Sequence, residues 1–92
     1  MRDTLGYTTA GMNASGRRLI INAVWDDEAR VWAATSDDVP GLATEADDME
    51  VLVERLKKMI PELLDANGVA RGEDVPFEIL GQRLAVAHRE AA

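Results

Sequence analysis

The stretch Ser36–Glu50, SDDVPGLATEADDME, combines a tight turn, a dense acidic run and a helix start. Pro40 fixes its own φ, and Gly41 can supply the positive φ that the next position of a type II turn requires. The chain is therefore predicted to reverse here and to leave through residues 42–44 as a short extended segment. Asp47–Glu50 has the spacing of a capping box, which predicts that a helix begins at about residue 48.

Two strand-like runs precede this stretch. Residues 19–26 alternate as a half-buried strand does, and one face carries Leu19, Ile21, Ala23 and Trp25. Residues 30–36 form the second run, and the polar link Asp26–Ala29 joins the two. This arrangement predicts an antiparallel hairpin with Trp25 and Trp32 near its turn.

An amphipathic helix is predicted from about Asp48 onward. Its apolar stripe has helical spacing and consists of Leu52, Leu56, Met59 and Leu63. Pro61 removes one helical hydrogen bond, so a kink or a break into a short second helix is expected there. Asn67–Gly68 then ends the helix with a glycine cap.

One more strand is predicted after the helix, with Gly81 as a bulge or bend. Its apolar residues are Phe77, Ile79, Leu84 and Val86. The predicted class is therefore α+β: an antiparallel three- to four-stranded sheet with one long amphipathic helix on one face. Residues 19–89 form this single domain, and residues 1–18, which are polar and rich in small side chains, form a flexible N-terminal tail.

Such a sheet has two open edges and one uncovered face. Tryptophan and branched side chains on the hairpin predict that this apolar surface associates with another copy. We expect a homodimer or a higher oligomer, with Trp25 and Trp32 as contact residues.

Composition excludes several functional classes. The formal net charge of −7 argues against direct nucleic-acid binding, which needs a basic patch, and favours basic protein partners. The chain has no cysteine, and no apolar run approaches the roughly 20 residues of a membrane span. No signal-peptide pattern precedes residue 17, so a cytoplasmic location is expected.

No catalytic residue, metal ligand set or cofactor site is predicted. His88 is the only histidine, so it cannot form a ligand cluster. Ser36, Thr35 and Thr44 lack the context of an activated nucleophile.

A combination of motifs resembles the HicB-type antitoxins. The residues that carry the resemblance are Trp32 in the hairpin, the segment Asp38–Leu42 (DVPGL), Thr44, Asp47 and Glu50, followed by the striped helix. Three longer segments resemble a smaller HicB-like branch of uncharacterised prokaryotic single-domain proteins. They are Val31–Leu42 (VWAATSDDVPGL), Ile60–Leu64 (IPELL) and Asn67–Gly68.

This resemblance implies a degraded ribonuclease-H-like fold without catalysis. HicB-type antitoxins block a small basic ribonuclease toxin and assemble into dimers or tetramers, so a small basic toxin-like protein is the expected partner. Full antitoxins usually add a C-terminal DNA-binding module. Only Glu90–Ala92 follows the last predicted strand, so no repression of an operon is expected.

The six acids of the opening stretch allow several interpretations. As a partner-binding surface, the residues expected to act are Asp37, Asp38, Glu45 and Asp48. In a structural interpretation, Asp47, Asp48 and Glu50 cap the helix, and Asp37 and Asp38 make turn hydrogen bonds. A metal-dependent nuclease using Asp37, Asp38, Glu45 and Asp47 is a further alternative, and a homo-oligomeric domain without a foreign partner is another.

Overall fold

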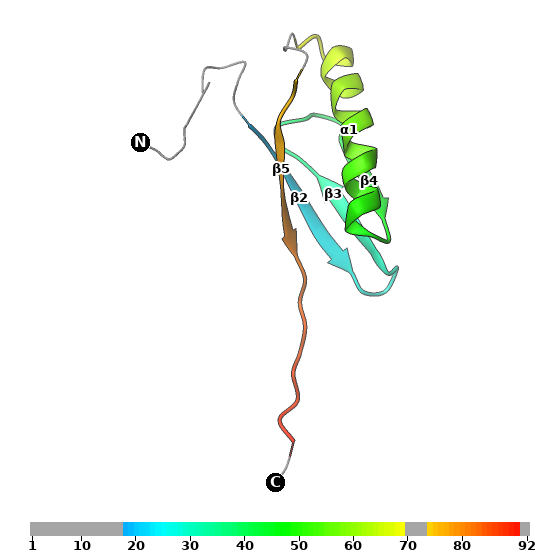
Figure 1. Cartoon of the computed structure of the whole chain (residues 1–92), viewed down its shortest axis with the longest axis vertical. Coiled ribbons are helices and arrows are strands. Elements are labelled where there is room, and N and C mark those ends of the chain that lie inside the picture. The colour runs from blue at the N-terminus through cyan, green and yellow to red at the C-terminus, as the bar shows by residue number, and fades with distance from the viewer. Residues whose placement is uncertain (1–17, 70–73, 91–92) are drawn as a thin grey trace, which may run out of the picture.

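The computed structural model describes residues 18–69 and 74–90. The predicted flexible tail lies outside the described residues except for Arg18. Four strands and one helix follow in the order predicted (Figure 1). They are β2 (Leu19–Asp26), β3 (Val31–Thr35), β4 (Ala43–Ala46), α1 (Met49–Ala66) and β5 (Phe77–Gln82).

The strands form one sheet in the order β4-β3-β2-β5, which confirms the α+β class. The pairs β2–β3 and β3–β4 are antiparallel, as predicted, whereas β5 runs parallel to β2. The parallel direction of β5 follows from α1, which carries the chain back along the sheet after β4. Because β4 runs in the direction of β2, a strand after this return runs in that direction as well.

The core lies between α1 and one face of the sheet. The helix buries residues at a spacing of four, and the sheet and the turn before β4 complete the cluster. The buried side chains are Leu19, Ile21, Ala23, Ala34, Val39, Leu42, Ala46, Leu52, Leu56, Ile60 and Leu64. Met59 and Leu63, which the sequence placed in the stripe, are half-buried at its border.

The predicted type II turn before β4 is confirmed. The Leu42 amide donates to the Val39 carbonyl oxygen at 3.1 Å, and Gly41 has a φ of 88°. The turn places Val39 and Leu42 in the core under the helix, while the Asn67 side-chain amide donates to the Pro40 carbonyl oxygen at 3.1 Å. The turn and the helix C-terminus are thereby joined.

The helix cap lies one residue later than predicted. Asp48 is the N-cap, and its Oδ1 accepts from the amides of Glu50 at 2.7 Å and Val51 at 3.3 Å. Asp47 is one position too early for its side chain to reach these amides. With Asp48 at the cap, the third helical residue is Val51, which has no carboxylate to complete a capping box.

The helix runs unbroken through Pro61, so the predicted alternative of a second short helix is wrong. Pro61 lies on the exposed side, and the buried residues Ile60 and Leu64 hold the helix on the sheet around it. Gly68 has a φ of 72°, which confirms the glycine at the helix end.

The last strand is shorter than predicted. β5 ends at Gln82, and Leu84 and Val86 lie beyond it in an extended segment. Its last residue, Gln82, pairs with Val24, so the final two residues of β2, Trp25 and Asp26, have no partner in β5. Gly81 pairs in register with Ala23 and makes no bulge.

Candidate protein-binding surface

The acidic stretch does not form one cluster. Asp37 and Asp38 lie in the loop after β3, Glu45 lies within β4, and Asp47 and Asp48 follow β4. A four-residue strand spans roughly 13 Å. The two aspartate pairs therefore lie near opposite ends of β4.

The Asp38 side chain has a structural role in the fold. Its Oδ2 accepts from the Ile20 amide at 2.8 Å, and Ser36 Oγ donates to the Ile20 carbonyl oxygen at 2.6 Å. The Asp38 amide in turn donates to Ser36 Oγ at 3.0 Å. Both side chains are half-buried, so they satisfy backbone groups at the start of β2 that would otherwise be poorly hydrated.

Four acids of the stretch are left for a surface role. Asp48 is committed to the helix cap, as described above, whereas Glu50 in the first turn of α1 and the three acids Asp37, Glu45 and Asp47 near β4 are exposed. Within residues 18–69 and 74–90, none of these four carboxylates accepts a hydrogen bond or forms an ion pair. Of the four residues predicted to bind a partner, Asp37 and Glu45 therefore have carboxylates that the fold does not use.

An open groove of about 770 Å³ runs along the β4 edge. It is lined by Val31, Ala43, Thr44, Glu45, Ala46, Asp47 and Arg55. β4 is the terminal strand of the sheet, so its outer backbone groups face this groove without a strand partner. The position of Arg55 in this groove could not be predicted from the sequence, because Arg55 belongs to no recognisable motif together with the residues of β4.

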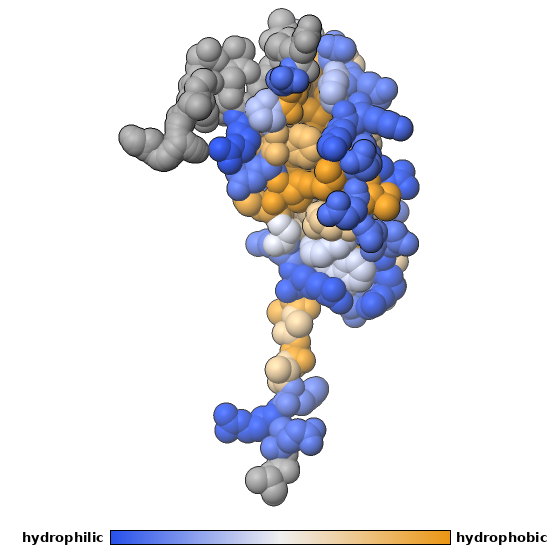
Figure 2. All heavy atoms as spheres, viewed as in Figure 1, coloured by the Kyte–Doolittle hydropathy of each residue, from blue (hydrophilic) through white to orange (hydrophobic). Residues whose placement is uncertain are grey.

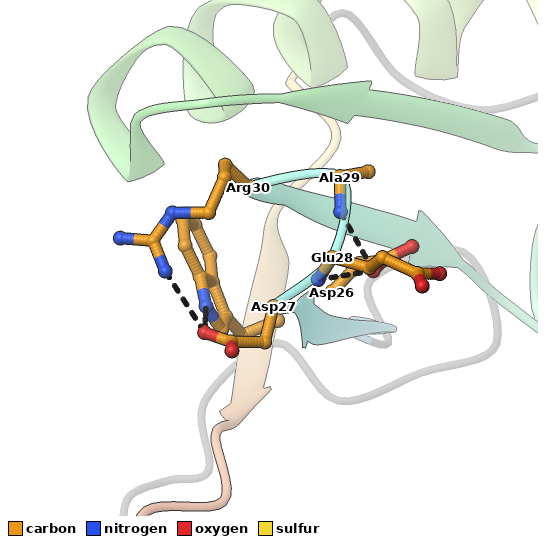
Figure 3. A network of polar contacts seen from close by, with 6 residues as sticks. Asp26, Asp27, Glu28, Ala29 and Arg30 are labelled. Carbon is orange, nitrogen blue, oxygen red and sulfur yellow. Dashed lines mark hydrogen bonds and ion pairs between the residues drawn. The ribbon is translucent and has the colours of Figure 1, made fainter.

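A second group of polar contacts lies at the turn that joins β2 and β3 (Figure 3). Asp26 Oδ1 accepts from the amides of Glu28 and Ala29, both at 3.0 Å, and thereby holds the turn. Asp27 Oδ1 accepts from Arg30 Nη1 at 2.9 Å. Arg30 has a φ of 61°, which is unusual for a residue with a side chain, and its amide closes the turn by donating to the Asp26 carbonyl oxygen at 2.7 Å.

The two tryptophans lie directly opposite each other in β2 and β3. Their ring centroids are 5.4 Å apart at an interplanar angle of 64°, an edge-to-face contact. Trp25 Nε1 donates to Asp27 at 3.3 Å, and the Arg83 guanidinium lies 4.6 Å from the Trp25 ring centroid. The packing partners of both rings are thus within the chain, and their role as contacts between copies stays a prediction.

No cluster of metal-ligating side chains is present among the described residues. The four carboxylates of the nuclease alternative, Asp37, Asp38, Glu45 and Asp47, are divided along β4, and Asp38 is held by the β2 backbone. His88 lies exposed in the segment after β5. In the described part of the chain, no helix is long and apolar enough to cross a membrane.

The described residues form a small α+β domain with one helix over a four-stranded mixed sheet. Exposed carboxylates lie along the terminal strand β4, and the described residues contain no cluster of metal-ligating side chains. The chain belongs to the domain family of unknown function DUF1902, whose model matches residues 18–88.

A solved structure is similar to this chain in both sequence and fold. The crystal structure of the hypothetical protein TTHA1013 from the extremely thermophilic bacterium Thermus thermophilus matches with a TM-score of 0.68 and 51% sequence identity. The match covers 77% of this chain and 100% of that chain. No curated protein matches. Neither the family nor the thermophile protein carries a functional name, so the resemblance to HicB-type antitoxins stays a prediction.

Proposed function

We propose that this protein is a non-catalytic, HicB-like protein-binding domain that occludes a small basic protein in the manner of an antitoxin. The observation that supports this proposal is the unpaired β4 edge, beside which lie carboxylates that the fold does not use. A cytoplasmic location is part of the same proposal, since the chain has no cysteine that would indicate an oxidising compartment.

The proposed contact is an extended segment of the partner that adds to β4 as a further strand. Backbone hydrogen bonds give such a contact its affinity, and side chains along the edge give it specificity. Glu45 projects within the edge strand, and Asp47 and Asp37 lie beyond its two ends. Lysine and arginine side chains of the partner would meet these carboxylates.

The net charge of −7 also acts over longer distances. It steers a basic partner toward the molecule and raises the association rate, and this effect weakens as salt screens it. A partner held in this way dissociates more readily in high salt.

The test begins with capture of a partner from native lysate at low salt, its identification by mass spectrometry, and titration of the two purified proteins. The decisive variant changes Asp37→Asn, Glu45→Gln and Asp47→Asn together, which removes three charges without touching Asp38 or Asp48. We expect the dissociation constant to rise at least tenfold and the salt dependence to flatten.

The matched control removes three exposed charges elsewhere, through Glu28→Gln, Glu62→Gln and Asp65→Asn. It should bind nearly as the wild type does. Equal binding by the decisive variant would refute the acidic-edge proposal. If the wild type yields only its own oligomer, the alternative of a homo-oligomeric domain without a foreign partner is favoured instead.

A further inference from the structure

Residues 83–90 continue β5 as an extended segment that leaves the body of the domain (Figure 1). None of their backbone groups makes a hydrogen bond with any described residue. The segment contains no glycine or proline that would allow a tight return onto its own sheet. Its backbone polar groups are therefore open to a partner outside the described chain.

This segment is apolar along one side. Leu84 and Val86 are 91% and 75% exposed, and Figure 2 shows the hydrophobic colour of the segment beyond the body. Side chains alternate along an extended chain, so these two residues share a side with Leu80, which is 46% exposed. The same uncovered sheet face carries Val24 on β2, 49% exposed.

The β5 strand is itself incompletely covered. It pairs with β2 on one side only, and its other edge is open. On the helix side, Phe77 and Ile79 are half-buried, and a groove of about 150 Å³ separates α1 from the start of β5. An open edge that continues into an apolar extended segment is a template for pairing with another strand.

We propose that two copies of this chain pair through these elements, with residues 83–90 of each lying antiparallel beside β5 of the other. Such a contact is isologous, because the same edge and the same segment are used twice around a two-fold axis. This two-fold pairing gives the open β5 edge and the extended segment of each copy a hydrogen-bonding partner, and the sheet becomes continuous across the dimer.

One register fits the side chains. With Gln82 opposite its own counterpart at the axis, Leu80 of one copy faces Leu84 of the other on the uncovered side. On the helix side, Ile79 and Phe77 then face the small residues Ala85 and Ala87. A shift that brings Arg83 opposite its counterpart places like charges together, and the opposite shift places Arg83 against Ile79.

Two further observations favour a second copy as the occupant. The family match runs to residue 88, so most of this segment is part of the common domain and not an appendage to it. In addition, Arg83 lies 4.6 Å from the Trp25 ring centroid, which anchors the start of the segment in its extended direction. Trp25 therefore lies next to the proposed interface.

This pairing goes beyond the proposed function and does not depend on it. It uses the β5 edge, whereas the basic partner is assigned to β4 at the opposite edge of the sheet. Both β4 edges stay accessible in the dimer.

The first test measures the mass of the full-length chain by sedimentation equilibrium over a dilution series. The wild type is expected to be a dimer, and the double variant Leu84→Asp/Val86→Asp should raise its dissociation constant at least tenfold. The control Val51→Asp/Val69→Asp changes two exposed valines away from the β5 edge and should leave the dimer unchanged. A monomeric wild type, or a dimer insensitive to the Leu84/Val86 change, overturns the proposal.

A second test reports on the register and does not rely on a destabilising change. The wild type has no cysteine, so Gln82→Cys introduces one thiol per chain, opposite its counterpart at the axis. Mild oxidation should give a disulfide-linked dimer of this variant at micromolar concentration, whereas Thr35→Cys, exposed at the end of the inner strand β3, should not. Equal cross-linking of both variants contradicts the pairing.

The proposed partner binding at β4 and the proposed dimerisation at β5 can be refuted independently of each other. Loss of dimerisation in the Leu84/Val86 variant leaves the β4 acids in place, so partner binding continues if that proposal is correct. The variant of Asp37, Glu45 and Asp47 leaves the β5 edge intact, and it should still dimerise.

Discussion

Ser36 and Asp38 hold the backbone of Ile20 from the loop after β3. The amide of Ile20 donates to the Asp38 carboxylate at 2.8 Å, and its carbonyl accepts from the Ser36 hydroxyl at 2.6 Å. Both groups of one strand residue are thus satisfied by side chains 16 and 18 positions away. The loop that follows β3 is thereby fixed on the start of β2.

Asp38→Ala is expected to lower the free energy of unfolding by about 1–3 kcal/mol, because the Ile20 amide loses its acceptor in a half-buried position. Asp37→Ala changes the neighbouring exposed carboxylate and should stay within about 0.5 kcal/mol of the wild type. Urea denaturation of the three proteins measures both values. Equal stability of the two variants would show that the Asp38 bond contributes little.

The helix cap offers a comparison between adjacent aspartates. Asp48→Ala should cost about 1 kcal/mol, because the amides of Glu50 and Val51 lose their acceptor. Asp47→Ala should cost a few tenths of a kcal/mol at most, because Asp47 caps nothing. Thermal unfolding followed by circular dichroism measures the difference, and the reverse order would assign the cap to Asp47.

At the scale of the element, α1 carries a proline in its interior. Pro61 has no amide hydrogen to donate to the Lys57 carbonyl oxygen, and an interior proline costs a helix roughly 3 kcal/mol relative to alanine. Packing of Leu56, Ile60 and Leu64 on the sheet offsets this cost, which explains why the helix stays continuous.

Pro61→Ala is therefore expected to stabilise the protein. The restored hydrogen bond and helix propensity, together roughly 3 kcal/mol, outweigh the greater freedom of the unfolded chain, which costs about 0.4–1 kcal/mol, so a net gain of about 2 kcal/mol is expected. The melting temperature should rise, while Glu62→Ala, at an exposed neighbouring position, should change it little. A lower melting temperature for Pro61→Ala would mean that the proline ring itself supports the packing.

Elements with a local signal could be predicted from sequence. The Pro40–Gly41 turn and the β2–β3 hairpin depend on neighbouring residues, and both are confirmed. The direction of β5 could not be predicted, because it depends on where α1 returns the chain. The acidic site was predicted as one surface. The structure divides it, since hydrogen bonding to Ile20 and to the helix amides decides which carboxylates stay available.

At the scale of the whole molecule, the proposed dimerisation through β5 would link stability to protein concentration. A partner that binds only the folded chain raises its apparent stability by mass action. The melting temperature should therefore rise by several degrees between about 1 and 100 μM, a hundredfold change, and the Leu84→Asp/Val86→Asp variant should show a flatter dependence. Differential scanning calorimetry measures both, and a concentration-independent wild type would contradict the dimer.

The parallel pairing of β2 with β5 also sets the order in which the chain folds. Leu19 pairs with Phe77, a separation of 58 positions (77 − 19), whereas β2 and β3 are joined by a four-residue turn. Closing the longer loop costs more chain entropy, so β5 is expected to join the sheet last and to leave it first. Native-state hydrogen exchange should accordingly show the amides of β5 opening at lower free energy than those of β3. The strand proposed to pair with a second copy is thus also expected to be the last part of the domain to fold and the first to open.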